Sequence, residues 1–219
     1  MELLFKILLG IHITGGAVSL IAGLVVVLLP KGTRLHRRWG RTFFWSLLVA
    51  SVVALPICYL HPSVFLALIS IFTLYMLLTG VRALQLGRQQ KPLVMDWTLT
   101  IAIALFGIGF IGLGGRSVSN GDSFGTVLMV FGGIGLLFAR QDWTRFKGRA
   151  TIKNSFLTTH LQRLTGSYIA SVTAFLVVNN KVLPGFVAWL LPTVLLTPLI
   201  FKWSRKYVVP VRTSVPENG

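Results

Sequence analysis

Residues 156–180, FLTTHLQRLTGSYIASVTAFLVVNN, combine an apolar run of membrane-crossing length with two ionisable side chains, His160 and Arg163. A helix needs about 20 mainly apolar residues to cross roughly 30 Å of hydrocarbon. The segment 156–178 satisfies this requirement. It therefore predicts a transmembrane helix that carries polar groups into the protein interior.

Six further apolar blocks of similar length occupy most of the chain. They cover roughly 5–29, 42–60, 63–84, 96–114, 122–139 and 184–203. Only 12% of the 219 residues are charged. The sequence lacks the alternation of apolar and polar residues that is typical of a transmembrane β-barrel, so we expect helices. The first block is too long for the apolar core of a signal peptide, so we treat it as a span.

The sequence thus predicts an all-α, polytopic transmembrane helical bundle of about seven spans. The connections are short, so we expect a single transmembrane domain over 1–205. The tail 206–219 contains two prolines and no periodicity, and we expect it to be disordered in the cytoplasm.

Positive charge is distributed unequally between the connections. Of the 21 Lys and Arg residues, 17 fall in the segments 31–41, 82–91, 140–153 and 202–212. Only Lys6, Arg116 and Lys181 fall on the opposite side of the spans. The positive-inside rule then predicts an N-terminus outside and a C-terminus in the cytoplasm.

The first basic connection, LPKGTRLHRRWGRTFFW at 29–45, allows two interpretations. It could anchor the protein, with arginines on anionic headgroups and its tryptophans in the aromatic belt. It could also form a pocket for a phosphate-bearing ligand, with His36 and the guanidinium groups as donors. Nucleic-acid binding is disfavoured because the charge is spread over juxtamembrane segments.

His160 and Arg163 are spaced i, i+3 and therefore share one face of their helix. An arginine inside a span costs roughly 2.5–3.5 kcal/mol at mid-membrane, so it should face the bundle and find a partner. We expect that partner to be Asp96, with Asp142 as the second choice. The group could be a structural ion pair or a ligand site.

Tyr75 and Arg82 are seven residues apart and share a face of the third span. We expect a cytoplasmic-side cavity covered by His36 and the first connection and lined by Arg82, Asp96, His160 and Arg163. Its ligand would be a small anionic or lipid-like molecule, bound or transported. His12, beside Thr14 and Gly15 in the first span, is more typical of hydrogen-bonded structure.

Several chemistries are unsupported by the residues present. The five acidic residues form no acid/base pair and no oxygen cluster for calcium or magnesium. The single cysteine, Cys58, rules out an intramolecular disulfide and a thiolate zinc site, and we predict no metal. The GIGFIG segment (107–112) matches a dinucleotide fingerprint but lies inside an apolar helix. We expect its glycines to pack against Gly132, Gly133 and Gly135.

Two other functions are compatible with the histidines. Haem b could be held by a pair at one depth, His12 with His61 outside or His36 with His160 inside. Alternatively, His160 or His36 could act as the general base of a membrane enzyme acting on a lipid or acyl group. The sequence leaves open whether the protein forms a homo-oligomer.

Two segments carry a family resemblance. HITGGAVSLIAGLVVVLLPKGTRLHRRWGR at 12–41, and HLQRLTGSYIASVTAFLVVN with WLLPTVLLTPLIFKWSRKY in the C-terminal half, resemble bacterial multi-pass membrane proteins grouped as a domain of unknown function. The resemblance implies an inner-membrane protein but no particular activity. It also implies recurrent polar positions at His12, His36, Arg41, His160 and Arg163.

Overall fold

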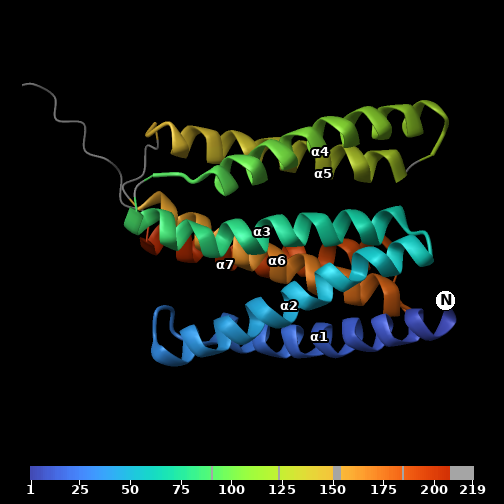
Figure 1. The fold of residues 1–219 in the computed structure, drawn as a ribbon, viewed down its shortest axis with the longest axis horizontal. Helices are drawn as coiled ribbons and strands as arrows, with labels where there is room; N and C mark the ends of the chain where they lie inside the picture. Colours follow the sequence, from blue (N-terminus) through green and yellow to red (C-terminus); the bar gives the residue numbers. More distant parts are fainter. Residues whose placement is uncertain (90, 123, 150–153, 184, 208–219) are drawn as a thin grey trace, which may run out of the picture. The chain divides into compact units, whose positions relative to one another are not determined.

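The computed structural model describes residues 1–89, 91–122, 124–149, 154–183 and 185–207, and these form seven α-helices (Figure 1). The helices are α1 (Glu2–Leu28), α2 (Arg34–Leu60), α3 (Val64–Gln89), α4 (Val94–Ser119), α5 (Phe124–Phe146), α6 (Ser155–Asn179) and α7 (Gly185–Tyr207). Each is long and apolar enough to cross a membrane. The predicted all-helical fold with seven candidate spans is therefore confirmed for the described part of the chain.

Several helices extend beyond the predicted apolar blocks. α2 begins at Arg34, although its apolar block begins at 42, because Thr33 caps the helix. The Thr33 hydroxyl accepts a hydrogen bond from the backbone N–H of His36 (3.2 Å). α5 likewise continues to Phe146 beyond the predicted end at 139. Hydropathy marks the part of a helix that can lie in hydrocarbon, whereas polar caps decide where the helix begins.

The predicted tail needs a similar adjustment. Lys206 and Tyr207 are the last residues of α7, whereas 208–219 lie outside the described residues.

The chain divides into two compact units. Unit 1 contains Met1–Val81 and Leu161–Trp203, and unit 2 contains Arg82–His160 with the residues that follow Trp203. Helices α3 and α6 each contribute residues to both units. The prediction of one domain over 1–205 stays a prediction.

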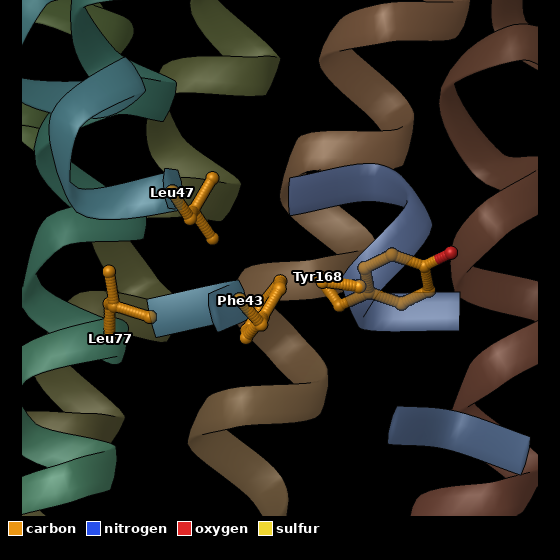
Figure 2. Packing of buried hydrophobic residues seen from close by; sticks show 5 residues of the cluster. Phe43, Leu47, Leu77 and Tyr168 are labelled. Carbon is orange, nitrogen blue, oxygen red and sulfur yellow. The ribbon is translucent and has the colours of Figure 1, made fainter. Parts of the chain in front are cut away.

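The core of unit 1 forms around an aromatic pair from α2 and α6. The rings of Phe43 and Tyr168 meet edge to face with centroids 6.0 Å apart, as Figure 2 shows. Ala22, Leu47 and Leu77 complete this buried cluster. The Tyr168 hydroxyl donates to the carbonyl of Leu20 on α1 (3.3 Å), so a single side chain links three helices.

In unit 2, α4 and α5 form an antiparallel hairpin (Figure 1) whose backbones approach closely at glycines. A Cβ on Gly107 would lie 2.8 Å from the Gly132 carbonyl oxygen, and one on Gly114 would lie 2.6 Å from the Gly125 carbonyl oxygen. The predicted role of Gly107 and Gly132 is confirmed. It is wrong for Gly109, Gly112 and Gly133, where a Cβ would meet no atom within 4 Å.

Candidate functional site

Arg163 is the largest fully buried side chain in the described residues, and only 1% of its surface is exposed. Its Nη1 donates to the hydroxyl of Thr79 on α3 (3.1 Å), and its guanidinium carbon lies 4.8 Å from the centre of the Tyr75 ring. The Thr79 hydroxyl in turn donates to the carbonyl of Tyr75 (2.6 Å). A hydrogen bond and a cation–π contact thus hold this arginine of α6 against α3.

The close approach of α3 and α6 at this point depends on a glycine. A Cβ on Gly80 would lie 3.0 Å from the Cβ of Arg163 and would overlap the Leu164 side chain. Gly80 therefore lets α6 approach α3 closely enough for Arg163 to contact Tyr75 and Thr79.

In unit 2, Arg82 and Asp96 form a buried two-pronged ion pair between α3 and α4. Arg82 Nε donates to Asp96 Oδ1 (2.8 Å) and Nη2 to Oδ2 (3.0 Å), while Nη1 reaches Gln85 (2.9 Å). The same carboxylate accepts from the backbone N–H of Leu93 (2.7 Å) at the start of α4. We predicted Asp96 as a partner of Arg163, but the ion pair that the structure gives it is with Arg82.

The second predicted partner, Asp142, is also engaged within its own helix. Its Oδ1 accepts from Arg145 Nη2 at 2.9 Å. The pair is not evident from the predicted spans, because Asp142 and Arg145 both lie beyond the predicted end of the fifth span at 139. Intrahelical i, i+3 spacing would have identified it.

The histidines occupy four different environments. His12 makes a 2.9 Å hydrogen bond between its Nδ1 and the carbonyl of Ala50, which agrees with the expected structural role in the α1–α2 pair. The centroids of the His61 and Phe5 rings are 4.0 Å apart. His36 is half-buried in the first turn of α2, and His160 is half-buried on α6.

A cluster of exposed positive charge in unit 1 lies on the first turns of α2. Arg34, Arg38 and Arg41 are exposed and recur at intervals of four and three residues, so they share one side of the helix. We call these three residues the arginine face. Trp45 continues the same stripe one turn later and is 61% exposed. The stripe combines guanidinium groups with an aromatic side chain, a combination typical of a membrane interface.

Lys31, in the same basic segment, makes its contacts within the protein. Its ammonium donates to the carbonyls of Val26, Val27 and Leu29 at 2.8–3.1 Å, and it lies 3.9 Å above the Trp203 ring. Burial lowers the pKa of this ammonium below its usual value. Lys31 therefore caps the C-terminal end of α1, whereas the side chains of the arginine face are exposed.

The structure brings together only some of the predicted site residues. Tyr75 meets Arg163 in unit 1, and Arg82 meets Asp96 in unit 2. Among the described residues, no group of three or more His, Cys, Asp or Glu could hold a metal ion. A cavity shared by all the predicted residues stays a prediction.

Two contributors to these sites are not evident from the sequence alone. Thr79 was overlooked because a threonine in an apolar helix gives no signal of its own. Hydropathy does not indicate the alignment of Arg34, Arg38, Arg41 and Trp45, because the apolar block begins only at 42. The threonine before Arg34 is a typical N-cap and would have placed the helix start correctly.

No protein-family model, curated protein or solved structure matches the chain. The resemblance to bacterial multi-pass membrane proteins therefore stays a prediction, and a functional proposal has to rest on the geometry.

Proposed function

We propose that the protein is an inner-membrane protein that binds an anionic, phosphate-bearing ligand at its cytoplasmic side, on the arginine face of α2. In this proposal the N-terminus is outside and the C-terminus is cytoplasmic, because 17 of the 21 basic residues then fall on the cytoplasmic side. The ligand is either a lipid headgroup or a free organic phosphate, since both present the same oxyanion to a guanidinium.

The observation that carries the proposal is the exposure of Arg34, Arg38 and Arg41 along one side of a helix N-terminus. Guanidinium groups bind phosphate oxygens through paired N–H donors. The first turn of a helix also favours negative charge through its unpaired backbone N–H groups and its dipole. Both effects favour an anion at the same end of α2.

The buried arginines are less suited to this role than the arginine face. Arg82 donates to Asp96 and Gln85, and Arg163 is 1% exposed and engaged with Thr79 and the Tyr75 ring. A ligand would have to displace these contacts before binding either residue. We therefore assign these two arginines to the stability of the helix packing and the arginine face to ligand binding.

The test is a thermal-unfolding titration of the purified protein in neutral detergent with glycerol phosphate. We expect the melting temperature to rise with glycerol phosphate, and to rise less when Arg38→Gln and Arg41→Gln are combined. An exposed ion pair contributes up to about 1 kcal/mol, so losing two should weaken binding by about tenfold to thirtyfold.

A matched control removes two exposed charges from α7, Lys202→Gln with Arg205→Gln. This variant has the same change in net charge and should keep the wild-type response. The proposal would be wrong if the wild-type protein showed no stabilisation, or if both double variants lost it equally.

A further inference from the structure

We infer that a groove between α1 and α2 holds one acyl chain of an anionic phospholipid whose phosphate lies on the arginine face. This inference rests on the proposed function and names the ligand class as a lipid. The groove has a volume of about 680 Å³ and belongs to the α1–α2 hairpin of unit 1. That volume is within the range of about 300–1,000 Å³ found for small-molecule sites.

The walls of the groove are suited to an apolar occupant. Gly10, Thr14 and Val18 of α1 face Trp45, Ser46 and Val49 of α2. Both hydroxyl groups are already satisfied within their own helices: Thr14 donates to the Gly10 carbonyl and Ser46 to the Thr42 carbonyl, each at 2.8 Å. Apart from Lys6, which pairs with Glu2 at the N-terminal end of α1 (2.7 Å), the groove presents hydrocarbon and satisfied hydroxyl groups. This lining favours a hydrocarbon chain over a polar ligand.

The groove extends from the level of Trp45 towards the N-terminal end of α1, which is the outer end in the proposed topology. On α1 it is lined from Lys6 to Val18, and Ile7 and Val18 are about 17 Å apart along the helix axis. Half of a hydrocarbon core of about 30 Å is about 15 Å. An acyl chain that enters beside Trp45 therefore reaches the bilayer centre within the groove, before the groove ends near Lys6.

The groove and the arginine face meet at Trp45. Arg41 precedes Trp45 by one helical turn, about 6 Å along α2, and both residues are exposed. A phosphate held by Arg38 and Arg41 would thus lie at the mouth of the groove, with its glycerol group beside the indole ring. Trp side chains favour this boundary between headgroup and hydrocarbon.

A second copy of the chain is the other occupant that such a groove could take. Because α2 carries the arginine face next to the groove, a symmetric pair docked through this side would bring the arginine faces of both copies together. Like charges opposed in this way disfavour association. An anionic lipid instead supplies the opposite charge.

The sequence offers a variant that fills the groove without disturbing the protein. Gly10 lines the groove, and a Cβ built there meets no atom within 4 Å. Gly10→Leu should therefore fold normally and occupy the volume assigned to the acyl chain. Gly16→Leu is the matched control, because Gly16 also has open space at Cβ, on a residue of α1 that does not line the groove.

The experiment measures lipid retention by native mass spectrometry after incubation with dioleoylphosphatidylglycerol or dioleoylphosphatidylcholine. Wild type and Gly16→Leu should retain the anionic lipid preferentially, and Gly10→Leu should retain it about tenfold less, a difference of about 1.4 kcal/mol. Gly10→Leu should still be stabilised by glycerol phosphate as strongly as wild type.

Two results would overturn the inference. One is wild-type retention by Gly10→Leu, which would leave the arginine face as the whole site. The other is a dimer that Gly10→Leu converts to monomer, which would assign the groove to a second copy. Failure of the proposed function itself would be seen separately, as loss of glycerol phosphate stabilisation in the wild-type protein.

Discussion

Replacing Asp96 with alanine should be among the most damaging single changes to unit 2. The side chains of Arg82 and Asp96 are 6% and 2% exposed, and two hydrogen bonds join them at 2.8 and 3.0 Å. Asp96→Ala leaves a buried guanidinium and removes the acceptor of the Leu93 N–H. Removing one partner of a buried pair typically costs about 3–5 kcal/mol, and we expect a loss of about 4 kcal/mol in the free energy of unfolding.

The assay is reversible unfolding in mixed micelles, with helicity followed by circular dichroism, as a double-mutant cycle. Arg82→Met should destabilise the protein by a similar amount, because it leaves the buried Asp96 carboxylate without the guanidinium that pairs with it. Combining Arg82→Met with Asp96→Leu replaces both charges with apolar groups, and this should lose less than either single variant.

The reasoning would be refuted if Asp96→Ala cost less than about 1 kcal/mol, well below the range for a buried pair. It would also be refuted if the double variant lost the sum of the two single effects. Either result would mean that Arg82 and Asp96 do not depend on each other in the folded protein.

Two further predictions concern packing and capping. Gly107→Ala places a Cβ 2.8 Å from the Gly132 carbonyl and should lower the free energy of unfolding by about 1–3 kcal/mol, whereas Gly109→Ala has open space and should be neutral or slightly stabilising. Equal melting temperatures for these two variants would contradict the close contact of α4 and α5. Lys31→Met removes three hydrogen bonds at the end of α1 and should cost about 1 kcal/mol in the same assay. An unchanged free energy of unfolding would mean that the Lys31 ammonium does not stabilise the C-terminal end of α1.

The sequence was most informative about the number of helices and their approximate positions along the chain. Seven apolar blocks identified the seven helices, because hydrocarbon thickness sets the length of a span. The glycine pair Gly107 and Gly132 was also predicted correctly, since small residues recur where membrane helices pack closely. Helix starts were less accurate, because hydropathy does not register an N-cap such as Thr33.

Pairing between helices was the harder problem. The chain has five acidic residues, and the sequence could not show which arginine each one meets. Depth along the membrane favoured Asp96 for Arg163, yet Asp96 binds Arg82. Depth fixes only one coordinate, whereas an ion pair also depends on the rotation and the neighbours of each helix.

The sequence by itself determined the class of the protein, its candidate spans and the excess of basic residues at alternate connections. Those properties depend on composition and local order along the chain. Only the tertiary structure decided that Arg163 is held by Thr79 and Tyr75, that Lys31 closes α1, and that the arginine face leads into a groove. These features depend on which sides of the helices meet, and helix rotation is set by packing contacts between residues far apart in the sequence.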